Sequence, residues 1–312
     1  MSANILVTGG CGYLGSTLVP RLLDAGHKVT VVDNLMFDQT SLNQVCHNPN
    51  FDFVKVDVRL EDEMKPLFAS ADIIIPLAAY VGAPLCKRDP IGAHTINNEA
   101  IKMMLRSLSR EQLVLMPTTN SAYGSGDQNN FCDETSPLNP ISKYSVDKVE
   151  IEQELMEHGN AVSFRLATVF GMSPRMRLDL LVNDFTYRAV NDGFLVLFES
   201  HFKRNYIHVI DIARVFMHGI ENHSSMLGEI YNVGLSDANV SKWELCEAIS
   251  RQIKSFYFVE AEVGVDPDQR NYIVSNAKIE ATGFKPEMSL DAGIAELIKG
   301  FRMINNRKYG NV

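Results

Sequence analysis

The feature that most constrains the fold is a glycine-rich turn near the start of the chain, placed directly between an apolar strand and a helix. Residues 4–8 form the short apolar run of a buried strand, and residues 16–25 have the apolar spacing of a helix. Gly9, Gly12 and Gly15 are spaced so that the backbone can turn sharply and approach a pyrophosphate closely. The pattern predicts a dinucleotide at the helix N-terminus. A glycine cluster that only packs the helix is the alternative.

An acidic residue follows where such a motif needs one. A second apolar strand is expected at residues 28–33, and it ends in Asp33, roughly 20 residues after the glycines. A carboxylate at this place can accept hydrogen bonds from the adenosine ribose hydroxyls and repels a 2′-phosphate. The sequence therefore favours NAD over NADP.

Tyr144 and Lys148 lie four residues apart in a helical stretch at residues 143–158, so they share one face of the helix. A tyrosine ordinarily titrates at about pH 10, and a neighbouring ammonium favours its phenolate. Such a tyrosine can take a proton from a substrate hydroxyl while hydride leaves the same carbon. This is alcohol-oxidation chemistry. The same spacing also occurs by chance on solvated helices, so the glycine turn is needed beside it.

Short apolar strands alternate with amphipathic helices as far as about residue 165. Further strands are expected at 51–56, 73–76, 113–116 and 162–166, with helices near 61–69, 95–109 and 143–158. This order predicts an α/β fold with a Rossmann-type, doubly wound parallel sheet and helices on both faces. Residues 1–165 would form the NAD-binding domain.

The alternation loosens after residue 166, where a smaller C-terminal lobe is expected over 166–312. Residues 172–179 look like a loop before a helix that carries Asp179 and Asn183. The chain is expected to return to the sheet at 204–209 and 230–233, so that segments near 204–234 belong with the first domain. The substrate lobe would then be interwoven with the NAD-binding domain rather than appended to it.

Composition limits the partners. A net charge of −9 argues against a nucleic-acid surface, which needs clustered Lys and Arg. No apolar run is long enough to cross a bilayer, and no apolar signal segment precedes the first strand, so a cytoplasmic protein without membrane contact is expected. The five cysteines show no metal-like or redox-motif spacing and are expected to be free thiols. No metal site is predicted.

Together these motifs resemble the extended short-chain dehydrogenase/reductase family that acts on nucleotide sugars, which includes UDP-galactose 4-epimerase and the sugar nucleotide 4,6-dehydratases. The resemblance covers nearly the whole chain and implies NAD as cofactor. Thr119, in Thr118-Thr-Asn-Ser-Ala-Tyr-Gly124, matches the family's third catalytic hydroxyl beside Tyr144 and Lys148. The cofactor-binding residues that it implies are Gly9, Gly12, Tyr13, Leu14, Gly15, Asp33, Asn34, Asp57, Val58, Leu77, Ala78, Ala79, Asn97, Tyr144 and Lys148.

A nucleotide-diphosphate sugar is the expected substrate. Guanidinium groups donate paired hydrogen bonds to a diphosphate, and Arg204 and Arg270 fall where the family carries its diphosphate-binding arginines. Arg175 and Arg177 share one short loop and either join them or belong to an ordinary surface loop. The candidate substrate-binding residues are Asn120, Ser121, Thr168, Arg175, Arg177, Asn183, Arg204 and Arg270.

Departures from the family narrow the reaction. Asn120 and Ser121 stand where the 4,6-dehydratases carry an aspartate and a glutamate, and an amide cannot act as a general acid, so dehydration is disfavoured. Thr168 stands where an asparagine is usual, which weakens any transfer of UDP specificity. The segments at 33–38, 81–86 and 173–184 most resemble a bacterial branch linked to GDP-heptose and capsule polysaccharide biosynthesis. That branch includes GDP-heptose C4 dehydrogenases.

The expected activity is NAD-dependent oxidation at C4 of a nucleotide-diphosphate sugar, of the GDP-hexose or GDP-heptose type, to a 4-keto sugar. The enzyme is then either a 4-dehydrogenase, with a 2-keto acid as a possible external oxidant, or a 4-epimerase that returns the hydride. A non-catalytic NAD-binding regulatory module is the alternative from another class. The family also implies a homodimer through the Tyr144 helix and residues 95–109, which contain Ile96, Ile101, Met103, Met104 and Leu105.

Overall fold

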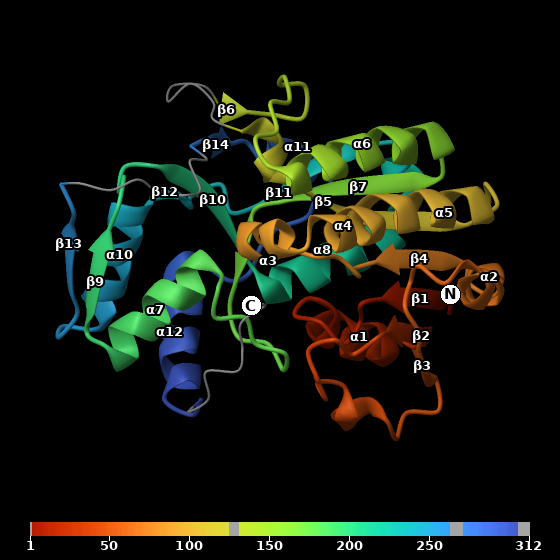
Figure 1. The fold of residues 1–312 in the computed structure, drawn as a ribbon, viewed down its shortest axis with the longest axis horizontal. Helices are drawn as coiled ribbons and strands as arrows, with labels where there is room; N and C mark the ends of the chain where they lie inside the picture. Colours follow the sequence, from red (N-terminus) through yellow and green to blue (C-terminus); the bar gives the residue numbers. More distant parts are fainter. Residues whose placement is uncertain (1, 125–130, 263–270, 305–312) are drawn as a thin grey trace.

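The computed structural model describes residues 2–124, 131–262 and 271–304. Its centre is a seven-stranded sheet with the order β11-β7-β5-β4-β1-β2-β3, in which every neighbouring pair is parallel (Figure 1). The predicted doubly wound parallel sheet is confirmed. Its strands are β1 (Asn4–Thr8), β2 (Lys28–Asp33), β3 (Phe51–Lys55), β4 (Ile73–Pro76), β5 (Leu113–Thr119), β7 (Ala161–Leu166) and β11 (Ile230–Val233).

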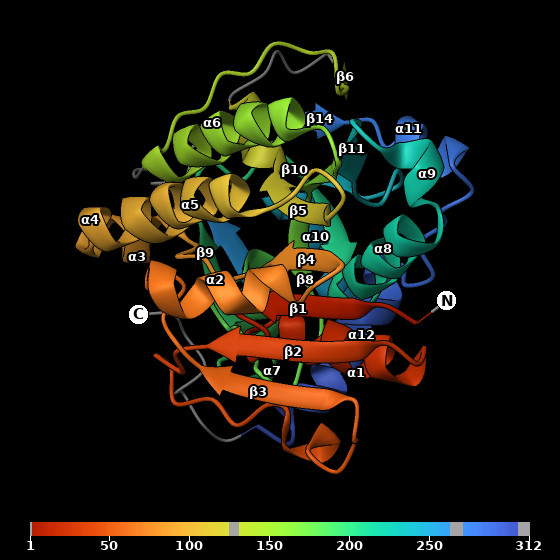
Figure 2. The same cartoon turned by 90° about the vertical axis from the view of Figure 1, so that its right-hand side faces the viewer.

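Helices cover both faces of this sheet. Figure 2 shows α5 and α6 on one side and α8 on the other. Successive residues of a strand point to opposite faces, so Ile5 and Val7 of β1 belong to one core cluster and Leu6 between them belongs to the other. The helices around the sheet are α1 (Gly15–Asp24) and α8 (Val209–Glu221) on the first face, and α2 (Glu61–Ala69), α5 (Ala100–Ser107) and α6 (Lys143–His158) on the second.

The smaller lobe lies beside the sheet, with α7, α10 and α12 at the left of Figure 1. Its strands pair as β8 (Thr168–Phe170) and β12 (Asn239–Ser241) on either side of β10 (Lys203–His208), β9 (Phe194–Leu197) with β13 (Tyr257–Glu260), and β6 (Phe131–Cys132) with β14 (Ile273–Val274). Its helices are α7 (Leu181–Asn191), α10 (Lys242–Gln252), α11 (Ala277–Ala281) and α12 (Leu290–Phe301). Shorter helical segments elsewhere are η1 (Asn43–Val45), α3 (Ala83–Arg88), α4 (Pro90–His94), the π-helical η2 (Thr95–Glu99), η3 (Asn120–Tyr123) and α9 (His223–Met226).

One of the two predicted returns to the sheet is wrong. β11 does pair with β7 at the edge of the central sheet, but β10 pairs with β8 and β12 instead. β10 is almost wholly buried in its own small sheet, and the residue pattern of a short buried strand does not tell which sheet receives it. The chain re-enters the first domain only afterwards, when α8 packs along α1.

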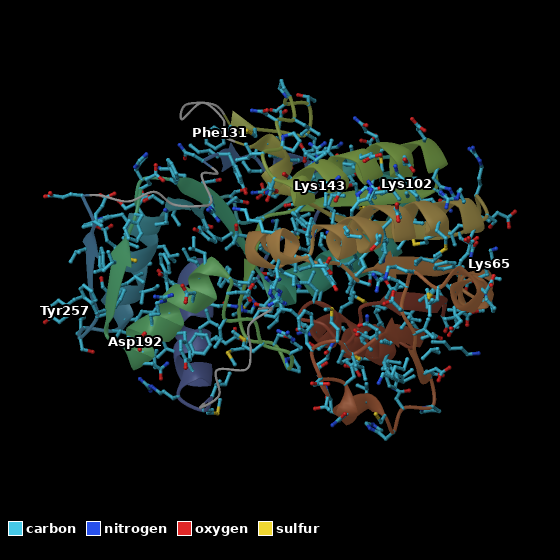
Figure 3. The ribbon with its side chains drawn as sticks, in the orientation of Figure 1. Lys65, Lys102, Phe131, Lys143, Asp192 and Tyr257 are labelled. Atoms are coloured by element: carbon cyan, nitrogen blue, oxygen red, sulfur yellow. The ribbon has the colours of Figure 1, made fainter. Side chains whose placement is uncertain are left out.

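The apolar residues predicted for a dimer surface are buried in the core of the protein itself. Ile96, Ile101, Met103, Met104 and Leu105 are each less than a tenth exposed, and most of them pack in the core beneath α5. Between α5 and α6 the surface is charged, because Lys102 forms ion pairs with Glu150 and Glu154 (Figure 3). These five residues are therefore not available to a second copy of the chain.

All five cysteines are free, as expected. In the described residues, none of the helices is both long and apolar enough to cross a membrane.

Candidate active site

The glycine turn has no room for side chains. Gly9 adopts a left-handed φ of +67°, and a Cβ atom there would lie 2.5 Å from the backbone nitrogen of Ala78. A Cβ atom on Gly15 would lie 2.4 Å from the carbonyl oxygen of Gly10. Only glycine lets β1, the turn and the N-terminus of α1 approach each other this closely. The result is a concave backbone surface at a helix N-terminus, which suits a bound anion.

Two adjoining cavities open at this turn, of about 530 Å³ and about 100 Å³. They lie at the carboxyl ends of the neighbouring strands β1 and β4, where the chain continues to β2 on one side and to β5 on the other, the usual ligand site of a doubly wound fold. Gly9, Gly12, Phe37, Leu77 and Ala79 line both cavities, so the two form one continuous site.

The smaller cavity gathers the residues predicted for the adenosine end of a dinucleotide. It is lined by Asp33, Asn34, Asp57, Val58 and Ala78, among others. Asp33 accepts hydrogen bonds from the Cys11 amide (3.1 Å) and the Leu35 amide (2.9 Å). Burial raises the pKa of Asp33, while these two amides oppose the shift. The hydrogen bond from Arg59 holds the pKa of Asp57 at about 2. This end of the site is acidic and rich in acceptors, which suits ribose hydroxyls.

The larger cavity brings together the three predicted catalytic residues, Thr119, Tyr144 and Lys148. α6 begins at Lys143 because Ser142 caps it with a reciprocal capping box to Ser145. Tyr144 consequently lies in the first turn of the helix and Lys148 one turn later, on the same face.

Lys148 is held deep in the site. Its side chain is 4% exposed, and its ammonium donates to the Pro117 carbonyl at the end of β5 (3.1 Å). Burial lowers the pKa of Lys148 to about 8, while the charge of Asp147 opposes the shift. The site thus contains a cation whose protonation changes close to neutral pH.

Thr119 is fixed by the turn that follows it. Its hydroxyl accepts a hydrogen bond from the Ser121 amide (3.1 Å) and donates to the Ser121 hydroxyl (3.0 Å). It therefore caps η3 at the end of β5. Thr119 and Ser121 both line the larger cavity, as does Tyr144.

The predicted arginines do not all have the same surroundings. Arg177 and Arg204 line the larger cavity with Thr168, and the Arg177 guanidinium pairs with Asp179 (Nε–Oδ1 3.1 Å). Arg175 also lines this cavity, but its guanidinium lies 4.8 Å from the centre of the Phe37 ring, at the junction of the two cavities. Arg270 lies outside the described residues.

Three predicted contact residues do not line either cavity: Asn97, Asn120 and Asn183. Asn97 accepts from the Tyr80 amide and donates to the Tyr80 carbonyl, both at 2.9 Å. Asn120 is fully buried, and its amide atoms have no hydrogen-bond partner within the part of the chain that the structure describes. Asp179 also differs from expectation, because it precedes α7 rather than belonging to it.

Asn183 instead holds a loop against the glycine turn. We call residues 171–180, between β8 and α7, the docked loop. Asn183 accepts from the Gly171 amide (3.0 Å) and donates to the Arg177 carbonyl (2.8 Å). The Tyr13 hydroxyl donates to the Gly171 carbonyl (2.6 Å), and the Ser173 hydroxyl donates to the Tyr13 carbonyl (2.8 Å). The two bonds of Tyr13 join residues more than 150 positions apart, so no local pattern could predict them.

Sequence reasoning also missed several lining residues. Phe37 was the most detectable, since it is an aromatic residue only four positions after Asp33, the end of the second strand. The others in the larger cavity include Val81, Lys87 and Tyr272. Nothing in their local sequence marks them, because they reach the cavity from two segments far apart in the chain.

Comparison with known proteins gives a consistent result. The family model described as "NAD dependent epimerase/dehydratase family" matches residues 5–234. The putative UDP-glucose 4-epimerase of Methanocaldococcus jannaschii is 26% identical, over 97% of this chain and 99% of that protein. UDP-glucuronic acid decarboxylase 2 of Arabidopsis thaliana is 28% identical, over 96% of this chain and 68% of that protein. The crystal structure of UDP-glucose 4-epimerase from Thermotoga maritima with UDP-glucose superposes with a TM-score of 0.82 at 25% identity, covering 96% of this chain and 99% of that one.

Proposed function

Since the chain belongs to the NAD-dependent epimerase/dehydratase family and is an NAD-dependent enzyme of the extended short-chain dehydrogenase/reductase type, we propose that it oxidises C4 of a nucleotide-diphosphate sugar to the 4-keto sugar. The observation that carries the proposal is the meeting of Tyr144, Lys148 and Thr119 in one cavity that continues into the glycine turn. The non-catalytic alternative is not proposed, because the chain belongs to a family of enzymes.

The site fits NAD. The glycine turn leaves its backbone open to a pyrophosphate, and Asp33 and Asp57 line the cavity that would receive the adenosine end. Bound NAD supplies a ring that accepts a hydride from a substrate carbon and can return it. Tyr144 and Lys148 would face that ring from the larger cavity.

The residues of the chain handle the proton. In the proposed reaction Tyr144 takes the proton of the C4 hydroxyl, while Thr119 holds the same oxygen by a hydrogen bond. Lys148 stabilises the phenolate through its ammonium. Arg177 and Arg204 are proposed to bind the diphosphate of the substrate, since both line the same cavity and a guanidinium matches the diphosphate oxygens. Thr168 and Ser121 are proposed as further contacts.

Two outcomes follow from the 4-keto sugar. If it turns over in the cavity before it is reduced again, the product is the C4 epimer, and the epimerases among the relatives favour this candidate. If it leaves, the enzyme is a 4-dehydrogenase and needs an external oxidant, for which we propose a 2-keto acid. The preference for GDP-hexose or GDP-heptose and a role in capsule biosynthesis are supported by sequence resemblance alone.

Product analysis with a panel of GDP-, UDP-, CDP- and dTDP-sugars tests the proposal. We expect the best turnover with GDP-linked substrates and no loss of water from any, because Asn120 and Ser121 cannot replace a general acid and base. Mass spectrometry and NMR separate the outcomes: an unchanged mass with inverted C4 identifies an epimerase, and loss of two hydrogens a dehydrogenase. Restored turnover on adding 2-oxoglutarate would identify the external oxidant. A dehydrated product would contradict the assignment of Asn120 and Ser121.

Cofactor choice is expected to depend on Asp33. Its carboxylate lies at the smaller cavity and would repel the 2′-phosphate of NADP. Asp33→Ser should therefore raise NADP affinity relative to NAD by about tenfold or more. Isothermal titration with both cofactors measures this ratio. Asp38→Ser is a suitable control on the same loop, because Asp38 lines neither cavity. Tighter binding of NADP than of NAD by the unmodified protein would show that Asp33 does not meet the ribose.

We propose a homodimer on family resemblance, with a surface other than the five buried apolar residues of the 95–109 segment. Light scattering at micromolar concentration should give twice the chain mass of 34.9 kDa. A monomeric mass would contradict the proposal. A cytoplasmic location also stays a prediction.

A further inference from the structure

Arg175 lines the larger cavity and packs on Phe37, a residue that both cavities share. Its side chain is 6% exposed, and its guanidinium lies over the ring of Phe37. Phe37 lines both cavities. The charged groups that act on Arg175 are Arg177, Asp179 and, less strongly, Asp33, which lines the smaller cavity. The guanidinium is therefore near the point where the two cavities join.

The backbone of Arg175 is fixed to the helix that follows the glycine turn. Its amide donates to the Ser16 hydroxyl (3.3 Å), in the first turn of α1. The same hydroxyl meets that of Ser173 (2.9 Å), two residues earlier in the docked loop. One guanidinium nitrogen donates to the Met176 carbonyl (2.6 Å), which orients the planar group. The side chain is thus held beside the N-terminus of α1.

A bound pyrophosphate would need a positive charge near the junction of the two cavities. A dinucleotide that spans the two cavities must carry its pyrophosphate past their junction, and a helix N-terminus offers only a partial positive charge. The side chains nearby at the adenosine end include two acids, Asp33 and Asp57, and the whole chain is acidic. An arginine fork can donate two hydrogen bonds to the pyrophosphate oxygens and offset that charge.

Arg177 provides the contrast within the same loop. It has the same side chain two residues later and lines the same cavity, but its guanidinium pairs with Asp179, whereas that of Arg175 lies over Phe37 and donates to the Met176 carbonyl. The two arginines therefore have different surroundings, although the sequence presents them as a pair.

We propose that Arg175 binds the pyrophosphate of the dinucleotide cofactor, whereas Arg177 serves the sugar nucleotide. The docked loop then couples the two binding events, because one short segment carries a ligand contact for each. The assignment needs the NAD site of the family but not the proposed C4 reaction. A wrong substrate or reaction would leave it intact.

The test compares Arg175→Gln with Arg177→Gln by isothermal titration of the full-length protein. The ligands are NAD, ADP and adenosine, followed by UDP and GDP added to protein saturated with NAD. A hydrogen bond to a charged group contributes about 1.5–3 kcal/mol, which corresponds to roughly a 10- to 100-fold change in affinity. Arg175→Gln should lose that factor for NAD and ADP and keep its affinity for adenosine, UDP and GDP. Arg177→Gln should keep NAD and ADP and weaken the better-bound of UDP and GDP.

Two results would overturn the assignment. One is unchanged NAD and ADP affinity in Arg175→Gln with weaker UDP or GDP, which would return Arg175 to the substrate. The other is equal weakening of adenosine, ADP and NAD, which would mean that Arg175 only supports Phe37 and the loop. Thermal melts check folding, and Arg175→Lys replaces a Gln variant that does not fold. The lysine keeps the charge but loses the fork, so ADP should still weaken relative to adenosine, and equal affinities would reject a paired contact.

Discussion

Replacement of Tyr144 by phenylalanine is expected to lower kcat by a factor on the order of a hundred or more, while NAD still binds. The substitution removes the phenolic oxygen and nothing else. The ring of Tyr144 packs partly against a cluster that contains Leu85 and Ile96, and phenylalanine keeps that packing. Initial rates with the substrate found by product analysis, together with the dissociation constant of NAD, measure both halves of the expectation.

Tyr187→Phe is the matched control. Tyr187 packs edge-to-face on Phe301, with ring centres 5.3 Å apart, and lies on neither cavity. Its hydroxyl should be dispensable, so this variant should retain nearly full activity. Near-normal turnover of Tyr144→Phe with NAD bound would reject Tyr144 as the base.

Lys148→Met is expected to abolish activity and yet stabilise the cofactor-free protein. A buried ammonium with few partners is unfavourable, and the pKa of Lys148 falls from 10.5 to about 8 on folding. At pH 7 the lysine is protonated in both the folded and unfolded states, so the folded state bears the full cost of burying the charge. This cost is on the order of 3 kcal/mol. A methionine fills similar space without that cost, although it leaves the Pro117 carbonyl without this donor, so the net gain should be about 1–2 kcal/mol.

The lowered pKa of Lys148 also determines how the stability of the protein changes with pH. Between pH 8 and 10.5 the unfolded state holds the Lys148 proton and the folded state does not, so the unmodified protein gains stability as the pH rises. The advantage of Lys148→Met should therefore shrink across this interval. Urea unfolding at pH 7 and at pH 10 measures it. Lys143→Met is the control on the same helix, because its ammonium is half exposed and pairs with Asp147. A Lys148→Met protein that is less stable at pH 7 would show that the ammonium is not strained by burial.

Much of the fold could be predicted because its signals are local. The helix at 143–158 appears with its predicted bounds, since Ser142 supplies a cap and Gly159 follows its end. The strand–turn–helix unit at the N-terminus follows from its glycines. The wrong sheet for β10 shows the limit: its partners, β8 and β12, lie in other parts of the sequence, and its own residues do not identify them.

The residues of the site likewise fall into those that local sequence predicts and those that it does not. Tyr144, Lys148 and Asp33 could be found because their chemistry depends on spacing within one element or on a strand end. Arg175 and Arg177 could not be separated, because their directions depend on how the docked loop attaches to residues far earlier in the chain. Asn183 was predicted to contact the substrate, but it binds backbone groups and the Tyr13 hydroxyl within the protein.

The attachment of the docked loop also determines where a hybrid between this enzyme and a relative can be joined. Its bonds to Tyr13 and Ser16 mean that a substrate lobe transplanted from a relative would meet a foreign surface at the very turn that receives the cofactor. A crossover placed after residue 166 would break these contacts although it looks like a clean boundary in the sequence. Hybrids that exchange positions 13 and 16 together with the transplanted lobe should be the ones that keep their cofactor. The part of the protein that must be exchanged as a whole is therefore a pair of distant segments and not one contiguous stretch.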